Sequence, residues 1–227
     1  MKKFSFLLFI ILLFFSIKSQ SHAHVTHYKQ FESIEMEIFR NDKLIGINNF
    51  YFSKENNLMK LKNIVQFKIS IAGIDLMKVD SESSGIYKDD MLIKFNSKTK
   101  QNDKDKFVNL YLDQNQFIID GSSFNGKTSS DYIIGNYWNH SVVKSEAQIS
   151  PLSGSVKKQK VKFLGKENIT LYGNNYSTLH FKILSSENLP KDKKINLDIW
   201  YDKKTLLLLK VSYQKLGLWE YRLKNYE

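Results

Sequence analysis

Histidines near the start of the chain are the first residues whose type and spacing could support chemistry. His24 and His27 are separated by two residues, and His140 and His180 occur far downstream. If an export signal is removed after Ala23, the new terminal amine and the His24 imidazole form a potential copper site, because imidazole suits copper and zinc. A cleavage site that falls beside a polar histidine explains the same pattern. We therefore predict no metal and no cofactor.

Motifs of the common catalytic sites are missing from the sequence. It contains no Gly-x-Ser-x-Gly elbow, no His-Glu-x-x-His pair and no cysteine. The segment Gly121–Gly126 has two glycines but lacks the Lys-Ser/Thr pair of a phosphate loop, and it predicts a plain loop. The 23 acidic residues leave a glycosidase-like pair open, but no two of them stand out. We predict no catalytic residue.

Aromatic side chains are better candidates for a binding surface. Tyr137, Trp138 and Asn139 lie in the least regular segment, whereas Trp200 and Tyr201 are adjacent in a predicted strand. Packing in the core or at a barrel mouth explains aromatic residues at these positions. The functional alternative is a concave aromatic wall that contacts a lipid, a sugar or a hydrophobic chain. The first three residues would then form a flap, and either Trp200 or Tyr201 would line the wall, because alternate side chains face opposite sides.

The first residues predict an export signal. Lys2 and Lys3 precede the apolar run 4–15, and the small residues Ser21 and Ala23 end the polar stretch that follows. This run is shorter than the roughly 20 residues that a membrane-spanning helix needs. We therefore expect a signal peptide at 1–23, cleavage after Ala23, a single domain at 24–227 and no transmembrane segment in the mature chain.

Composition and charge narrow the compartment and the partners. An exported chain without cysteine is typical of bacteria, and we predict a periplasmic or secreted protein of a Gram-negative bacterium. Loss of three lysines with the signal lowers the net charge from +11 to +8. The lysines are scattered, apart from a modest cluster at 157–162, and arginine occurs only at Arg40 and Arg222. Because nucleic-acid readers favour arginine for base contacts, we predict no nucleic-acid partner.

A period of two in the hydrophobic pattern predicts β-strands. Ile34, Met36 and Ile38 alternate with Glu35 and Glu37, as in a strand with one buried face. Similar segments recur along the chain and are separated by turn signals. They include tight turns expected at 165–167 and 173–175.

Only one region of the mature chain departs from the strand pattern. Residues 121–130 are rich in Gly, Ser and Asn and predict a loop, after which residues 129–131 could cap a short helix that ends at Tyr137. Because a sheet can protect its edges by curling, the expected fold is all-β. We predict a single strongly curved antiparallel sheet, or an open or closed β-barrel, with at most one short helix.

The order of these features resembles one known family. It comprises Leu44-Ile45-Gly46 in an opening hairpin, the segment GIYKDDMLIKFNSKTKQNDKDKFV, Tyr137-Trp138-Asn139 in mid-chain and LDIWYD at 197–202. This layout is similar to that of secreted bacterial proteins grouped as domain of unknown function 6134. The position after Tyr-Trp-Asn, commonly proline there, is His140 here. The resemblance implies the fold and the compartment, and it carries no catalytic residue across.

Three functions remain open from the sequence. We predict a non-enzymatic periplasmic protein that binds a hydrophobic or amphipathic ligand, such as a lipid, in the concave face of a curved sheet. The alternative is an envelope structural or interaction protein that binds a protein partner through a sheet edge or its basic face. A secreted hydrolase or copper-dependent enzyme is a further alternative. A deep apolar cavity favours the first, a filled core with an exposed apolar patch the second, and clustered ionisable groups in a cleft the third.

Overall fold

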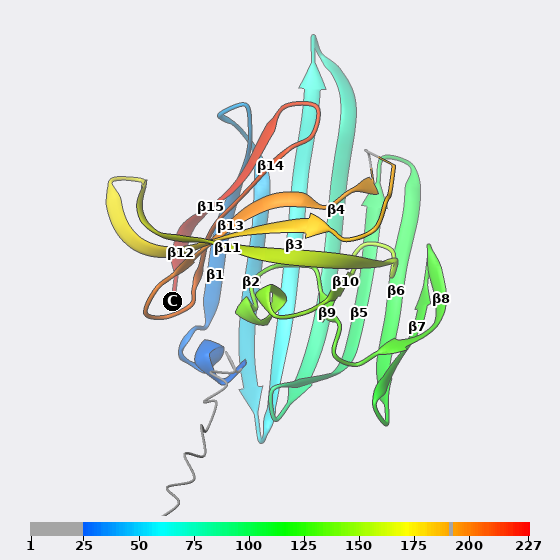
Figure 1. Cartoon of the computed structure of the whole chain (residues 1–227). Helices are drawn as coiled ribbons and strands as arrows, with labels where there is room; N and C mark the ends of the chain where they lie inside the picture. The colour runs from blue at the N-terminus through cyan, green and yellow to red at the C-terminus, as the bar shows by residue number, and fades with distance from the viewer. Residues whose placement is uncertain (1–24, 191–192) are drawn as a thin grey trace, which may run out of the picture.

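A computed structural model describes residues 25–190 and 193–227, and these residues form one large sheet (Figure 1). The sheet has fifteen strands in the order β8-β7-β6-β5-β4-β3-β2-β1-β15-β14-β13-β12-β11-β10-β9. Neighbouring strands are antiparallel, except for the parallel pair β9 and β10. The elements are η1 Val25–Gln30, β1 Ser33–Arg40, β2 Lys43–Glu55, β3 Leu58–Ile71, β4 Ile74–Lys88, β5 Met91–Gln101, β6 Lys104–Asp113, β7 Gln116–Gly121, β8 Phe124–Ser129, β9 Ile133–Ile134, η2 His140–Val143, β10 Ala147–Ile149, β11 Val156–Leu171, β12 Asn174–Ser185, β13 Asn196–Asp202, β14 Leu208–Gln214 and β15 Leu218–Tyr226.

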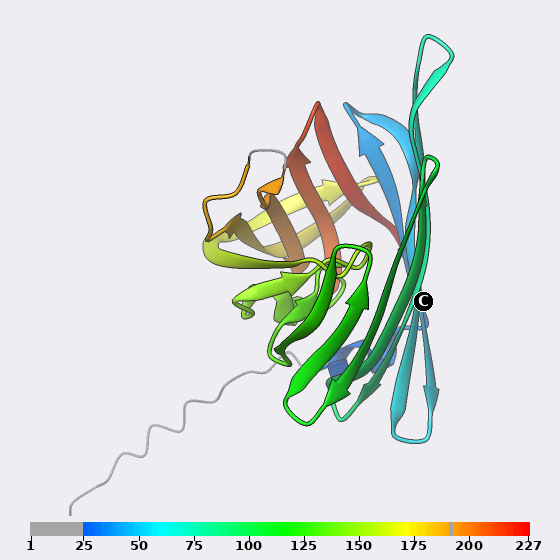
Figure 2. The same cartoon turned by 90° about the vertical axis from the view of Figure 1, so that its right-hand side faces the viewer.

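The sheet is a meander whose first and last strands pair with each other. β1 to β8 follow one another through short turns, β10 to β15 also pair in sequence order with a longer connection between β12 and β13, and β15 pairs with β1. The break in the sheet therefore falls in mid-chain, between β8 and β9, which only residues 130–132 separate. Figure 2 shows the result, in which the strands of the first half curve around toward the strands of the second half.

Backbone contacts bring the two sides of this break close together. Ser123 N donates a hydrogen bond of 2.9 Å to Ser153 O, which follows β10. A Cβ atom on Gly121 would lie 2.8 Å from Ser153 O, so this approach requires glycine at the end of β7. The sheet thus approaches closure without a continuous ladder across the break.

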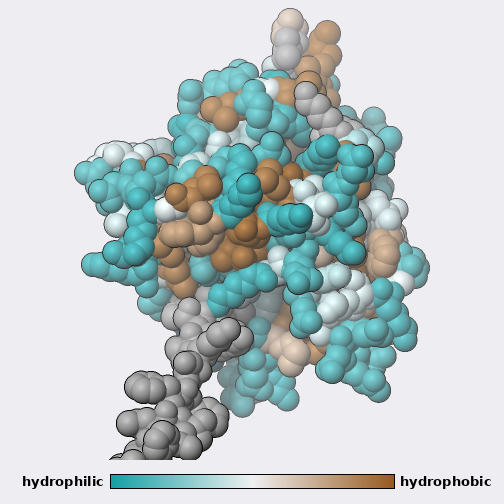
Figure 3. Space-filling view, viewed as in Figure 1, coloured by the Kyte–Doolittle hydropathy of each residue, from teal (hydrophilic) through white to brown (hydrophobic). Residues whose placement is uncertain are grey.

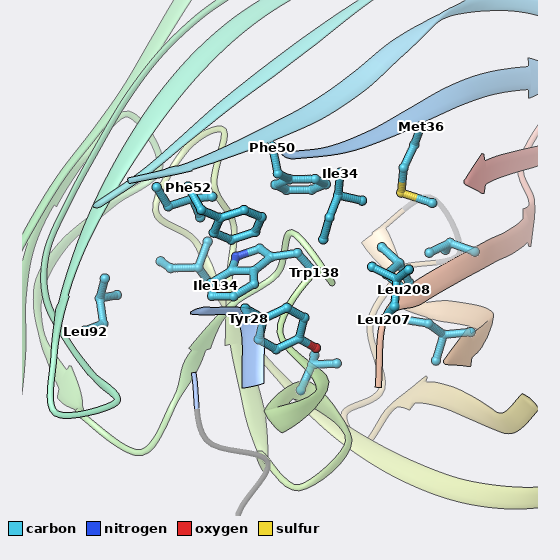
Figure 4. Packing of buried hydrophobic residues seen from close by; sticks show 14 of the residues in the cluster. Tyr28, Ile34, Met36, Phe50, Phe52, Leu92, Ile134, Trp138, Leu207 and Leu208 are labelled. Atoms are coloured by element: carbon cyan, nitrogen blue, oxygen red, sulfur yellow. The ribbon is translucent and has the colours of Figure 1, made fainter. Parts of the chain in front are cut away.

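The concave side of the sheet is filled by its own chain. One hydrophobic cluster includes inward-facing residues of both halves of the sheet, and Trp138 lies within it without exposed surface. The Trp138 ring centroid is 4.8 Å from that of Tyr28 in η1, 5.3 Å from that of Phe52 and 5.5 Å from that of Tyr87. Figure 4 shows Trp138 between Tyr28 and Phe52, with strands β1 and β2 beyond them. The segment between β8 and β11 therefore forms part of the core.

Three local predictions were wrong. Residues 165–167 do not form a tight turn, because β11 continues through them with a register shift between Phe163 and Gly165. The φ of Gly165 is +134°. Glycine with positive φ occurs in β-bulges as well as in tight turns, so its presence in the sequence did not distinguish a bulge from a turn. The expected loop at 121–130 contains β8, which pairs with β7 despite its polar residues. The helix expected to end at Tyr137 is replaced by β9, and η2 begins later, where Asn139 caps it.

The predicted fold class is confirmed, since the described chain forms a single strongly curved and almost entirely antiparallel sheet. In the described ranges, no helix is long and apolar enough to cross a membrane. The predicted signal peptide at 1–23, its cleavage after Ala23 and His24 lie outside the described residues.

Candidate functional site

The three residues expected to form a flap lie inside the molecule. Trp138 is fully buried, and Asn139 is 6% exposed, with its side chain accepting a hydrogen bond from Ser141 N at the start of η2. Tyr137 is partly buried, has a φ of +65° and donates its hydroxyl to Gln148 Oε1 at 3.2 Å. This segment does not cover an opening, because its side chains pack against the inner face of the sheet. Trp138 therefore lies where the core-packing interpretation of the aromatic residues places it.

Trp200 and Tyr201 face opposite sides of β13, as strand alternation predicts. Tyr201 is fully buried and donates its hydroxyl to Tyr137 O at 2.7 Å. Burial raises the pKa of Tyr201 well above its ordinary value, so the phenol keeps the proton that this bond needs. Trp200 lies on the outer face, where its ring stacks on that of His180 at 4.2 Å and 18°. The fold thus joins Tyr137, Trp138 and Tyr201 in the core and separates Trp200 from them.

The histidines do not converge. His140 is buried beside the ring of Tyr201, with centroids 4.8 Å apart, whereas His180 lies on the outer face between Glu167 and Asp198. The two rings therefore lie on opposite sides of the sheet and cannot share one metal ion. The side chain of His27, like His24, lies outside the described residues. Across the part of the chain that is described, no group of three His, Cys, Asp or Glu residues could hold a metal ion.

A long unpaired edge on β11 is a candidate recognition feature of the molecule. β11 pairs with β12 from Gln159 to Leu171, but β10 covers its other edge only from Val156 to Lys158. Over residues 160–171, no described strand lies beside this second edge. Such an edge presents backbone donors and acceptors that another extended chain can use.

The hydrogen bonds around Gln159 show which groups point toward the open edge. Gln159 N donates to Glu146 O at 2.7 Å, on the side of β10. Lys158 O accepts from Ser186 N at 3.1 Å, on the side of β12. Because successive residues of an antiparallel strand bond alternately to either side, the backbone groups of Val161 and Phe163 point toward the open edge.

Side chains around this edge differ between the two faces of the sheet. Lys158, Lys160 and Lys162 are exposed and share one face, because they alternate with Val161 and Phe163 on the other. Phe163 is 54% exposed although its ring lies 5.1 Å from that of Phe181, and Leu164 at the bulge is 53% exposed. The edge is therefore basic on one face and apolar on the other.

The surface view agrees with this arrangement. Figure 3 shows hydrophobic side chains gathered near the middle of one face, in the region of β11 to β13, with hydrophilic side chains around them. The sequence identified the lysine cluster at 157–162, but it did not show that these lysines flank a free edge. The pairing of β11 depends on the tertiary structure, and its only local sign was the alternation of Lys with apolar residues from 160 to 163.

Comparisons with known proteins place the chain at the level of family and fold. A family model described as "Domain of unknown function (DUF6134)" matches residues 36–224. The comparison with curated proteins found no match. Among solved structures, the chain is similar to a β-barrel-like protein of domain of unknown function DUF1849 from Brucella abortus. The TM-score is 0.58 at 7% identity, and the similarity covers 86% of this chain and 95% of the other. At this identity the similarity shows the fold alone.

Proposed function

Since the chain belongs to the DUF6134 family, whose description names no activity, we propose a function from the geometry of the molecule itself. It is a non-enzymatic interaction protein of the bacterial cell envelope, and it binds an extended segment of a protein partner along the open edge of β11. The unpaired backbone of this edge, flanked by lysines and by exposed apolar side chains, is the observation that carries the proposal.

The filled core favours this function over carriage of a hydrophobic ligand. A lipid in the concave face would need an apolar cavity there, of the size that ligand sites usually have. Trp138, Tyr201 and most inward residues of the strands occupy this space in one packed cluster, and Ile38, Ile69 and Trp219 form a second. A filled core together with exposed apolar residues is the combination expected of an interaction protein.

Addition of a strand to a sheet edge supplies both affinity and selectivity. Backbone hydrogen bonds hold the added segment, while alternate side chains meet the two faces of the sheet. A segment paired with residues 160–163 would place one set of side chains beside Lys160 and Lys162 and the other beside Val161 and Phe163. The complementary partner therefore alternates acidic and apolar residues.

A direct test uses a fluorescent synthetic peptide in which glutamate and valine alternate, with a lysine–valine peptide as its counterpart. We expect the acidic peptide to bind and the basic peptide not to bind. The double variant Lys160→Glu with Lys162→Glu should weaken binding by about tenfold or more, because like charges across an interface are unfavourable. Fluorescence anisotropy at physiological salt measures both affinities.

The matched control is Lys98→Glu with Lys100→Glu, since these exposed lysines have the same spacing on β5, which is paired on both edges. This variant should bind the acidic peptide as the unchanged protein does. An equal loss of peptide affinity in both double variants would show that the peptide is attracted to the overall positive charge, and it would refute pairing at the edge of β11. Slower hydrogen exchange at the Val161 and Phe163 amides on binding is required as well, because only strand addition protects those groups.

Export is part of the proposal and rests on the first 23 residues of the sequence. Expression of the full chain in a Gram-negative host, followed by intact-mass measurement of the periplasmic fraction, tests it. We expect a chain that begins at His24. Recovery of the uncleaved chain from the cytoplasm alone would refute the localisation.

A further inference from the structure

The outer face of the second half of the sheet carries an ordered set of polar side chains. Cross-strand neighbours form two rows over strands β12, β13, β14 and β15, and the first row continues onto β1. The first row is His180, Trp200, Lys210, Arg222 and Glu37, and the second is Lys182, Asp198, Ser212 and Glu220. Residues opposite one another on one face of a sheet interact directly, so the rows form a continuous network.

Glu220 is the centre of this network. Its Oε1 contacts Lys210 Nζ, and its Oε2 accepts from Arg222 Nε at 2.9 Å and from Arg222 Nη2. The Glu220 side chain is 7% exposed. Burial raises the pKa of Glu220, but the hydrogen bonds from Lys210 and Arg222 outweigh this effect and leave the pKa below its ordinary value. Glu220 therefore stays ionised and balances one of the two cations beside it.

Both carboxylate oxygens of Glu220 are engaged, which argues against a catalytic role. A general base must reach the proton that it abstracts through a free oxygen. Paired ionic networks also shift pKa values without catalysis. The clustered ionisable groups that would favour an enzyme are thus better explained by ion pairing and by binding.

The turn between β11 and β12 closes over part of this network. It leaves a cavity of about 320 Å³ lined by Thr170, Leu171, Tyr172, Lys210 and Arg222. Two of these five residues are cationic and none is a carboxylate. Tyr172 is held in place by its hydroxyl, which donates to Glu37, and by Lys224, whose Nζ lies 4.5 Å from the ring centroid.

The cations of the cavity retain hydrogen-bonding capacity. A lysine ammonium has three donors, and the contact with Glu220 uses one of them. Arg222 bonds to Glu220 and Asp42 through Nε and Nη2, and Nη1 makes no hydrogen bond to any described residue. The five lining residues include two cations and no carboxylate, and each cation keeps a donor for a ligand although Glu220 and Asp42 pair with them.

We propose that this cavity binds a small anion through a carboxylate or phosphate group, with Lys210 and Arg222 as its direct contacts. The size of the cavity lies at the lower end of small-molecule sites, which suits a small ligand. Charge-assisted hydrogen bonds from lysine and arginine are the usual means of holding such groups. This site lies on the outer face and is distinct from the open edge of β11.

Titration of the full mature protein with inorganic phosphate, with acetate and with chloride tests the site. Shifts of the Trp200 indole signal in nitrogen–proton NMR spectra report binding, because Lys210 Nζ lies 5.2 Å from the Trp200 ring centroid. We expect saturable shifts with phosphate or acetate and none with chloride. Saturation by phosphate alone identifies phosphate-bearing ligands, and saturation by acetate as well identifies carboxylates. No saturation at millimolar concentration by either would overturn the proposal.

Substitution distinguishes the site from general attraction to a basic protein. Lys210→Met keeps the side-chain stem and should weaken anion binding by about tenfold or more, since it removes a direct charged contact. Lys182→Met is the matched control, because Lys182 lies on the same face, pairs with Asp198 and does not line the cavity. The double variant Lys210→Met with Glu220→Gln removes both charges of one pair and guards against misfolding of the single variant. Unchanged binding in both Lys210 variants would refute the assignment.

Discussion

The two faces of one sheet use tryptophan in opposite ways. On the inner face, the neighbouring rings of Trp138 are Tyr28, Phe52 and Tyr87, and the indole has no exposed surface. On the outer face, Trp200 stacks on His180, lies near Lys210 and donates its indole N–H to Glu167. Trp138 occupies the interior space that a ligand would need. Trp200 instead lies on a charged surface beside a cavity. Position relative to the sheet, more than residue type, separates structural from binding aromatics here.

Removal of the inner tryptophan should have the largest effect. Trp138→Ala should lower the free energy of unfolding by about 3–5 kcal/mol, because it leaves a large cavity in a packed core. Urea denaturation measures the loss through a lower midpoint at an unchanged slope. If Trp138→Ala lowered the free energy of unfolding by less than Trp200→Ala does, the comparison between the inner and the outer face would be reversed.

The ion pairs of the outer face should contribute less to the free energy of unfolding than Trp138 does. Glu220→Gln should cost about 1–3 kcal/mol, because it leaves Lys210 and Arg222 without their shared carboxylate. Glu82→Gln is the control, since Glu82 forms an exposed pair with Lys62 and should change stability by about 0.5 kcal/mol or less. Equal costs for the two variants would mean that the outer network behaves as an ordinary exposed surface.

The outer tryptophan should have a smaller effect still. Trp200→Ala loses one aromatic stack, one cation–π contact and the hydrogen bond to Glu167, together worth about 1–2 kcal/mol at a partly exposed site. Thermal unfolding followed by circular dichroism measures this change. Retention of the fluorescence of the two remaining buried tryptophans, Trp138 and Trp219, checks that the core is intact in the variant, and its loss would show that the two faces are coupled.

Acid should weaken the outer network before it affects the inner one. The folded-state pKa of Glu220 lies below its unfolded value of about 4.3, so its stabilisation is complete above that value. This contribution is lost as the pH falls from about 4.3 through the lower folded-state pKa. The stability difference between the unchanged protein and Glu220→Gln should therefore shrink over this range. Urea midpoints at several pH values measure it, and a difference that stays constant would contradict the shift.

Much of the local structure followed from alternation along the chain. Ile34, Met36 and Ile38 are all buried, as their spacing predicts, and Tyr201 and Trp200 face opposite sides. Local structure was predicted wrongly where the same sequence signal is compatible with two backbone structures. Gly165 serves a bulge in β11 rather than a turn, and the polar segment 124–129 forms β8 because its backbone pairs with β7.

The candidate sites show the same limit more sharply. The sequence showed the lysines of β11 and Arg222, but not their surroundings. A free edge exists only because β10 is short, and the anion cavity exists only because the β11–β12 turn reaches Lys210 and Arg222. These contacts join residues far apart in the chain, and no local pattern encodes them.

By itself, the sequence determined the all-β fold class and the faces of most strands, because each of these depends on neighbouring residues, whereas the export signal stays a prediction. Only the tertiary structure decided that Trp138 fills the interior, that β15 pairs with β1 and that the edge of β11 remains open. The physical reason is that burial and strand pairing depend on the whole chain. Each residue has a local conformational preference, and packing of the whole sheet determines which of these preferences the folded chain adopts.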